Sequence, residues 1–453
     1  MFRAERSRAR WNALGVDGLS GLAWHRSFWL LLAAVLGLSD GRLGRRAALR
    51  GLVAMMGPAF LSRGARNAGE RPAYRAVAPE AATAFAFAVG SAQEHPAAGA
   101  VLLPLAASVV AARTKVGRRP VAVSEALTGA ALGVAFGLAT RRLWPVAPRR
   151  PAEVRRVWSV VSAEPMPEGE GMVLIVNPSS GPAWSSDPTD ALREGLPRAE
   201  IVRLDEDTTL EKALAGVEGA RALGVAGGDG TVNAVAEAAL RHNLPLLVVP
   251  SGTLNHFARD LGVESVEESI ESVRSGELVA VDVGMIDGSP FLNTASFGSY
   301  AALVDARESL EERIGKWPAM LVALVRVLWR GQPVRAEIDG RRVKVWMIFI
   351  GNCRYQPEGL APGWREQLDD GLLDVRLVDG SSPFSRTRLL LAVLAGRLAR
   401  CPVYHRAVVT SLRVHSQEGP LRLARDGETF DGGTDVIVRK HPTRLRVFRP
   451  STD

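Results

Sequence analysis

Cysteine and histidine are scarce in this chain of 453 residues, which contains two cysteines, Cys353 and Cys401, and seven histidines. Two cysteines exclude a disulfide-stapled scaffold and a cysteine-rich zinc module. The histidines form neither an HExxH pattern nor a histidine-rich tract, so the sequence indicates no dedicated transition-metal site. The Walker pattern GxxxxGK[ST] and the motif set of protein kinases are also absent, which excludes two common phosphate-transfer architectures.

The length, with 47% hydrophobic and 23% charged residues, predicts two or three folded domains and excludes a disordered chain. The charge is uneven along the chain. Residues 1–150 contain 21 Lys and Arg against 7 Asp and Glu, whereas residues 151–453 contain 35 against 41. The basic residues flank apolar stretches, which favours a membrane surface as partner. We expect no nucleic-acid partner.

The N-terminal region contains apolar segments that are rich in Ala and Gly. They lie at residues 28–38, 47–62, 81–92, 97–112 and 126–140. Each is shorter than the roughly 20 residues of a clean membrane-spanning helix. Small residues nevertheless permit close helix packing in a bilayer. We predict an α-helical membrane bundle over 1–142, with a soluble Ala-rich bundle as the alternative. A proline-rich linker is predicted over 143–170.

The same region resembles the type 2 phosphatidic acid phosphatase family, whose motifs are K-x6-RP, PSGH and SR-x5-H-x3-D. Arg71-Pro72 matches the end of the first motif, but Gly64 replaces its Lys. Val77-Ala78-Pro79-Glu80 replaces PSGH, and Arg119 and Val123 stand where the third motif has His and Asp. A phosphohistidine mechanism needs these groups. The resemblance therefore implies a degenerate domain without phosphatase activity, serving as an anchor or a lipid-presenting scaffold.

From residue 172 onward, short apolar runs end in polar turns that contain glycine. MVLIV (172–176) precedes NPSSG, ALGVA (222–226) precedes GGDGTVN, and LPLLVV (244–249) precedes PSGTLNH. Continuous apolar strands that alternate with helical stretches predict a parallel α/β sheet. Ligands bind such sheets at the carboxyl ends of the strands. The three turns therefore predict one convergent site.

These turns suit a phosphate ligand. Glycine lets the backbone approach an anion closely, and free N–H groups at a helix N-terminus attract negative charge. Asp229 lies inside the second turn, where a carboxylate can hold Mg²⁺ through water or accept a proton. A single GGDG could be an ordinary turn, but three such turns in series favour a binding site.

The motifs NPSSG, GGDGTVN and PSGTLNHFARDLG, in this order, resemble the diacylglycerol kinase catalytic-domain family, which has NAD kinases as distant relatives. Further matches are Val281–Gly284, Asn293 with Ser296–Gly298, Ala361-Pro362 through Gly371, and Asp426-Gly427-Glu428. The resemblance covers about 172–448. It implies an α/β nucleotide-binding lobe over 171–280 and a β-rich lipid-substrate lobe over 281–453, with ATP in the cleft between them.

The resemblance also implies the roles of individual residues. Those that would contact the nucleotide are Asn177, Ser179, Ser180, Gly181, Thr209 or its neighbour Thr208, Gly227, Gly228, Asp229, Gly230, Thr231, Asn233, Gly252, Thr253, Asn255 and Glu428. Asp370 matches the general base, although Asp-Gly pairs are usually turns and Asp229 could share the role. His256 stands where bacterial relatives often have Asp, so the metal ligands stay unassigned.

We therefore expect an ATP- and Mg²⁺-dependent lipid kinase. Its acceptor would be diacylglycerol or a related lipid alcohol. The expected location is a bacterial inner membrane, with the kinase portion facing the cytoplasm. The alternatives are a catalytically silent lipid-binding scaffold, a bifunctional phosphatase–kinase, and a kinase that acts on a soluble metabolite.

Overall fold

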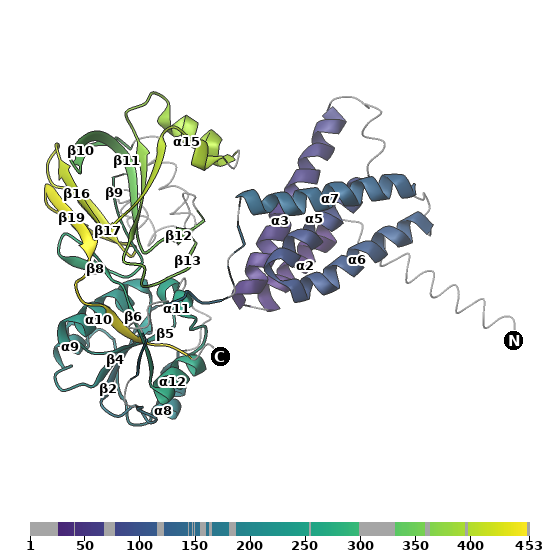
Figure 1. The fold of residues 1–453 in the computed structure, drawn as a ribbon. Helices are drawn as coiled ribbons and strands as arrows, with labels where there is room; N and C mark the ends of the chain where they lie inside the picture. Colours follow the sequence, from purple (N-terminus) through teal and green to yellow (C-terminus); the bar gives the residue numbers. More distant parts are fainter. Residues whose placement is uncertain are drawn as a thin grey trace, which may run out of the picture. The chain divides into compact units, whose positions relative to one another are not determined.

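The structure is a computed structural model in which the chain divides into two compact units, residues 1–147 and 148–453 (Figure 1). The boundary falls inside the predicted linker. The residues described are 26–39, 41–67, 78–115, 122–143, 145–146, 148, 150–154, 160–162, 165–180, 187–252, 255–298, 331–357, 363–394 and 397–450.

The first unit is helical. Its helices are α2 (Arg26–Ser39), α3 (Gly41–Asn67), α5 (Pro79–Glu94), α6 (Pro96–Lys115) and α7 (Val123–Leu143). Every predicted apolar segment lies within one of them. Glycines spaced four residues apart on α7 meet α5: a β-carbon would lie 2.4 Å from the Ala78 carbonyl oxygen at Gly129 and 2.3 Å from the Ala82 carbonyl oxygen at Gly133. These glycines allow the two backbones to approach closely.

The first unit buries a charged pair and exposes many large apolar side chains. Arg50 is fully buried and donates from Nε to Glu94 Oε1 over 2.8 Å, and its Nη1 lies 3.3 Å from Thr140 Oγ1. Trp29 and Phe87 are buried too, but other large apolar side chains face outward, among them Leu31, Leu38, Phe60, Val101 and Leu127. Buried polar contacts and an apolar exterior are typical of helices packed in lipid.

Length and composition single out one described helix as able to cross a membrane, at Val123–Arg142. Two shorter apolar helices lie at Ser27–Leu38 and Pro96–Ala112. In the region of the phosphatase-like motifs, Pro79 and Glu80 begin α5 and Val123 begins α7. Arg71, Pro72 and Arg119 lie outside the described residues.

The second unit begins with an α/β lobe. Its strands are β1 (Val160–Ser162), β2 (Met172–Val176), β3 (Glu200–Arg203), β4 (Ala222–Gly227), β5 (Leu246–Pro250), β6 (Glu277–Val281) and β20 (Leu445–Phe448), in the order β1-β6-β20-β5-β4-β2-β3. The helices are α8 (Thr189–Gly195), α9 (Leu210–Ala215), α10 (Asp229–His242), α11 (His256–Leu261) and α12 (Val266–Ser275). The strands β2 to β5 are parallel, as their unbroken apolar runs predict.

Two segments differ from the predicted division of the chain. Val160–Ser162 pairs antiparallel with β6, so the segment 143–170 is not a linker throughout. The strand β20 lies between β5 and β6, although its residues fall in the range predicted for the β-rich lobe. Both strands are too short to show periodicity, and only their distant pairing partners place them in this sheet. The return of the chain through β20 ties the two lobes together.

The β-rich lobe is antiparallel. Its strands are β7 (Gly284–Ile286), β8 (Ser289–Phe291), β9 (Thr294–Gly298), β10 (Val334–Ile338), β11 (Arg341–Asn352), β14 (Leu373–Asp379), β15 (Tyr404–Val409), β16 (Ser411–Ser416), β17 (Arg422–Arg425), β18 (Glu428–Asp431) and β19 (Asp435–Lys440). A short hairpin, β12 (Tyr355–Gln356) and β13 (Trp364–Arg365), and the helices α15 (Ser385–Leu394) and η2 (Leu398–Arg400) complete it. A core that includes Phe291, Phe297 and Ile348 fills this lobe.

Candidate active site

The predicted turns meet at the carboxyl ends of the parallel strands. Gly227 ends β4 and Gly228 follows it, and Gly252 follows β5, which is the neighbouring strand. A β-carbon on Gly252 would lie 2.7 Å from Gly228 Cα and 3.2 Å from the Gly227 carbonyl oxygen. The two backbones therefore touch, and a side chain at residue 252 would separate them. The contact between the two backbones explains why residues 228 and 252 are glycines better than an isolated turn does.

The turn after β2 joins the same site through hydrogen bonds. Asn177 Nδ2 donates to Thr231 Oγ1 over 3.0 Å, which links the end of β2 to the first turn of α10. Ser179 N–H donates to Asn177 Oδ1 over 3.1 Å, and Ser180 Oγ donates to the Asn177 carbonyl oxygen over 2.6 Å. A β-carbon on Gly228 would lie 3.7 Å from Ser180 Cβ. Asn177 thus holds the turn against the glycine loop.

The helix α10 starts at the glycine turn that follows β4. Gly228 is its N-cap in extended backbone geometry, and in the described part of the chain no side chain caps that end. The first N–H groups of a helix lack intrahelical partners and carry partial positive charge. Since the helix is 14 residues long and the glycine turns surround its start, a phosphate group is a suitable partner.

Glu428 comes from the β-rich lobe and reaches the glycine turn. A β-carbon on Gly230 would lie 2.0 Å from Glu428 Oε1, so the carboxylate lies directly over that residue. The preceding Asp426 accepts the backbone N–H groups of Leu292 and Asn293 at 2.7 and 2.8 Å. Burial raises the pKa of Asp426 to about 6. The segment Asp426-Gly427-Glu428 of the β-rich lobe therefore holds the Glu428 carboxylate beside the glycine turn of the α/β lobe.

Asp229 connects the glycine turn to the next helix. Its Oδ1 accepts the His256 backbone N–H over 3.0 Å at the start of α11. Burial raises the pKa of Asp229, partly offset by this hydrogen bond. The His256 ring nitrogen Nδ1 lies 3.1 Å from Arg259 Nη2. A histidine–guanidinium contact thus stands where the sequence resemblance implies a carboxylate.

Two predicted residues, Asn233 and Asn255, bind other parts of the protein through hydrogen bonds, and a third, Thr209, caps a helix. Asn233 is 3% exposed, and its Nδ2 lies 3.3 Å from the Pro290 carbonyl oxygen of the other lobe. The Asn255 amide exchanges two hydrogen bonds of 2.8 Å with the backbone of Gly252 and so closes that turn. Thr209 is the N-cap of α9. Gly181 and Thr253 lie outside the described residues.

A cleft of about 610 Å³ opens beside the first turn. Its lining includes Asn177, Ser179, Thr208 and Thr209, together with Arg203 and the loop that follows β3. Four residues that were assigned to the nucleotide from sequence therefore line one cavity. The cavity lies at the carboxyl ends of β2 and β3, where ligands of parallel sheets bind.

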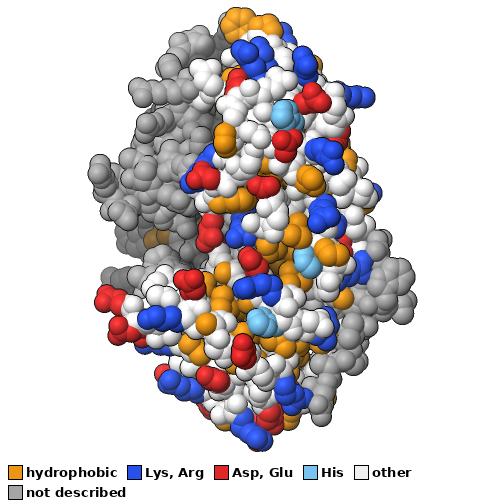
Figure 2. Space-filling model, turned by 90° about the vertical axis from the view of Figure 1, so that its left-hand side faces the viewer, with side chains coloured by type: hydrophobic (Ala, Val, Ile, Leu, Met, Phe, Trp, Pro, Cys, Tyr) orange, Lys and Arg blue, Asp and Glu red, His pale blue; other side chains and the backbone are white. Residues whose placement is uncertain are grey.

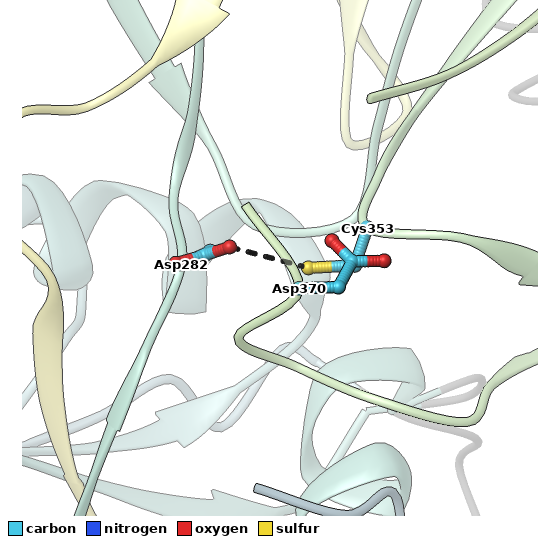
Figure 3. Close-up of side chains that lie close together, drawn as sticks. All are labelled: Asp282, Cys353 and Asp370. Atoms are coloured by element: carbon cyan, nitrogen blue, oxygen red, sulfur yellow. Dashed lines mark hydrogen bonds between the residues drawn. The ribbon is translucent and has the colours of Figure 1, made fainter. Parts of the chain in front are cut away.

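Asp370 lies in a second polar cluster at the junction of the lobes. The Arg354 and Leu372 backbone N–H groups donate to its carboxylate over 3.0 and 2.8 Å. One ligand-type atom each of Asp282, Cys353 and Asp370 lies within 4.8 Å of the others (Figure 3). Burial raises the pKa of the Cys353 thiol to about 12, so this cysteine is not a ready nucleophile.

The charges around this cluster do not favour a metal ion. Lys440 Nζ lies 3.5 Å and Arg444 Nε lies 3.0 Å from the Asp282 carboxylate. These two cations already neutralise the acidic groups. Asp229, by contrast, offers a carboxylate beside the open start of α10, which suits a hard cation that prefers oxygen ligands.

Arg365 links α11 to the β-rich lobe and was not found by the sequence analysis. It is 2% exposed, and its Nε donates to Asp260 Oδ2 over 2.7 Å. Its Nη2 lies 3.1 Å from Asn293 Oδ1 in the β-rich lobe. Asp260 belongs to α11, the helix whose start binds Asp229. Nothing in the local sequence marks this arginine, because its partners are 72 and 105 positions away.

The contact between Gly228 and Gly252 leads to a direct test. We expect Gly252→Ala to raise the KM for ATP about tenfold, equivalent to about 1.4 kcal/mol, because the methyl group meets main-chain atoms that cannot move aside. Gly216→Ala is a matched control, since that residue has φ −89° and its β-carbon would lie 3.7 Å from the nearest atom. Equal KM values for the two variants would contradict the close approach.

Two family models match the second unit. The diacylglycerol kinase catalytic domain matches residues 171–286, and the YegS C-terminal NAD kinase beta sandwich-like domain matches residues 295–449. A Pseudomonas fluorescens protein named "Probable lipid kinase YegS-like" is 30% identical over 256 residues, which cover 54% of this chain and 82% of that protein. The chain belongs to the diacylglycerol kinase catalytic-domain family.

Further relatives carry the same family name. The diacylglycerol kinase of Bacillus subtilis is 29% identical over 181 residues, which cover 38% of this chain and 59% of that protein. The crystal structure of a diacylglycerol kinase from Bacillus anthracis is similar with 18% identity and a TM-score of 0.43, over 62% of this chain and 97% of that chain. Membership of the family confirms the two-lobe diacylglycerol/NAD kinase-like fold and makes the second unit a lipid kinase.

Proposed function

We propose that the protein transfers the γ-phosphoryl group of ATP, with Mg²⁺, to the hydroxyl group of diacylglycerol or a related lipid alcohol. The observation that carries this proposal is the meeting of three backbone turns, the open start of α10 and Glu428 at one place. This arrangement suits a polyphosphate chain, because the start of α10 offers N–H donors that no side chain caps in the described part of the chain. The family membership supports a lipid acceptor.

In this proposal each group of residues has a separate role. The turns at Gly228 and Gly252 hold the phosphates, and the cleft beside Thr209 takes the nucleoside. Asp229 would hold Mg²⁺, which when bound neutralises the charge of the phosphate oxygens. Asp370 takes the proton of the lipid hydroxyl as that oxygen attacks the γ-phosphorus, and ADP leaves. The hydrogen bonds from the Arg354 and Leu372 backbones hold its carboxylate in place for this step.

We further propose that the first unit is a membrane anchor without phosphatase activity, and that the kinase faces the cytoplasm. The support is its apolar exterior, where Leu31 and Phe60 face outward, and the burial of Arg50 together with Glu94. An anchor confines the enzyme and its lipid substrate to one surface, which raises their encounter frequency. The missing histidines of the phosphatase-like motifs argue against a bifunctional enzyme.

A labelling experiment tests the proposed reaction. Membranes that contain the protein are incubated with γ-labelled ATP, Mg²⁺ and a panel of lipid alcohols, and label is counted in the chloroform and water phases. We expect label in chloroform, and we expect Asp229→Ala to lower the rate about 100-fold or more. Asp190→Ala is the control, because that side chain is 98% exposed. Label found only in the water phase would exclude a lipid acceptor.

A further inference from the structure

Part of the β-rich lobe presents large apolar side chains to solvent. Phe384 is 79% exposed, Leu391 is 60% exposed and Leu390 is 54% exposed. They lie at the start of α15 and along it. Large apolar side chains that gather on one exposed element mark an interaction site more often than isolated ones do. Neither the nucleotide cleft nor the Asp370 cluster includes these residues.

The helix α15 is attached by one face, and its exposed side carries two leucines beside Thr387 and Arg388. Leu389 is buried in a cluster with Trp346 and Leu398. The Arg386 guanidinium lies 5.3 Å from the centre of the Trp346 ring and donates to the Gly331 carbonyl oxygen. A surface helix of a soluble domain normally carries polar residues on its outer face. Here Leu390 and Leu391 are on the outer face, so attachment to the lobe leaves apolar surface uncovered.

The charge of this segment has one sign. Residues 380–400 contain four arginines and neither Asp nor Glu. Arg388, Arg397 and Arg400 are exposed. By contrast, basic and acidic side chains are interspersed over the face of the molecule drawn in Figure 2. An apolar helix flanked by arginines alone is complementary to a surface that is apolar inside and negatively charged outside.

The backbone before the helix is strained in a way that exposes an aromatic ring. Phe384 has φ 57°, in the left-handed region that bulky residues avoid. Its carbonyl oxygen accepts the Arg388 backbone N–H over 2.9 Å, so it starts the helix. Strained residues cluster at sites that bind a partner. In this case the strained residue is also the most exposed large apolar side chain described in the second unit.

We propose that the α15 surface, formed by Phe384, Arg388, Leu390, Leu391, Arg397 and Arg400, docks the kinase unit on an anionic lipid bilayer. The apolar side chains would enter the boundary between headgroups and acyl chains, while the arginines bind lipid phosphates. The lipid-kinase function explains why contact with a bilayer is useful. The docking proposal rests on that function. Docking itself involves no catalytic step.

Docking through α15 also orients the active site. The strand β14 begins three residues after Asp370 and ends six residues before α15. Its seven residues span about 23 Å. If β14 stood upright on the bilayer, Asp370 would be held about this far from the surface, beyond reach of a lipid hydroxyl. The proposal therefore requires the docked strand to lie along the bilayer, with both of its ends at the lipid.

The test places a fluorophore on the full-length protein. Leu390→Cys is labelled with an environment-sensitive dye, which is selective because Cys353 and Cys401 are both buried. Ile437→Cys on β19 is the matched control, since Ile437 is also a large apolar residue and is 45% exposed. Both proteins are placed in nanodiscs of phosphatidylcholine, with or without phosphatidylglycerol. Quenching by a nitroxide-labelled lipid then reports contact with the bilayer.

We expect a blue shift and quenching at position 390 in the anionic discs and neither change at position 437. No change at 390 in either disc would overturn the proposal. A response of equal size in neutral discs would overturn the role of charge. A shift in lipid-free detergent that grows with protein concentration would assign the surface to a second copy of the chain, and would also overturn it.

A kinetic measurement separates docking from the reaction. We expect Leu390→Ser/Leu391→Ser to raise the apparent KM for long-chain diacylglycerol in anionic vesicles about tenfold, because two leucines leave the bilayer. The KM for ATP and the rate with a water-soluble short-chain acceptor should match those of Ile437→Ser. An unchanged lipid KM would contradict docking, whereas an inactive wild type with the fluorescence response intact would reject the kinase function alone.

Discussion

Asp370→Asn is expected to lower kcat of the lipid kinase by a factor of about 100 to 10,000, the usual range for loss of a general base. The asparagine has nearly the same shape but cannot take up a proton from a lipid hydroxyl. The backbone N–H groups of Arg354 and Leu372 that donate to Asp370 keep a side chain of this size in place. The KM for ATP should change little, because Asp370 lies outside the phosphate turns. Single-turnover transfer from labelled ATP to diacylglycerol measures the step directly.

Two comparisons make this result specific. Glu366→Gln removes an exposed carboxylate from the same segment and should retain full activity. Asp229→Asn tests the alternative base: if Asp229 takes the proton, that variant loses kcat while Asp370→Asn keeps it. An Asp370→Asn enzyme with more than half of the wild-type kcat would rule out Asp370 as the base.

Arg365→Met is expected to lower the free energy of unfolding of the kinase unit by about 3–5 kcal/mol, because it leaves the buried Asp260 without its partner. Arg365 also donates from Nη1 to the Leu292 carbonyl oxygen over 2.7 Å, and its guanidinium lies 5.4 Å from the centre of the Tyr355 ring. Methionine fills a similar length but satisfies none of these groups. The melting temperature of this unit should fall by about 5–8 °C. Thermal unfolding of the full-length protein in detergent measures it.

The cause of this loss can be separated from a simple packing defect. Arg354→Met removes an exposed arginine nearby and should leave the melting temperature unchanged. Asp260→Leu combined with Arg365→Met removes both charges, and it should recover part of the lost stability because no uncompensated ion remains. If the double variant is less stable than Arg365→Met, the buried charge is not the source of the effect.

Local sequence determined the α/β lobe and the position of its turns. The runs at 172–176 and 222–226 coincide with β2 and with most of β4, because a strand that is covered on both faces needs unbroken apolar residues. The glycines at 228 and 252 were predicted for phosphate contact, and the structure brings them together at neighbouring strand ends. The strands and the glycine turns depend on residues that are close in sequence, so a local sequence pattern reveals them.

Only the tertiary structure decided which distant residues meet. Glu428 reaches Gly230 across the two lobes, and Arg365 joins Asp260 to Asn293 inside the protein. Short strands such as β1 and β20 also gain their place from partners far away in the chain. A buried ion pair or a three-residue strand has no period and no local composition, because its energy comes from groups that folding alone brings within reach. Sequence therefore revealed the glycine turns, whereas the fold decided how the carboxylates predicted to be catalytic are held.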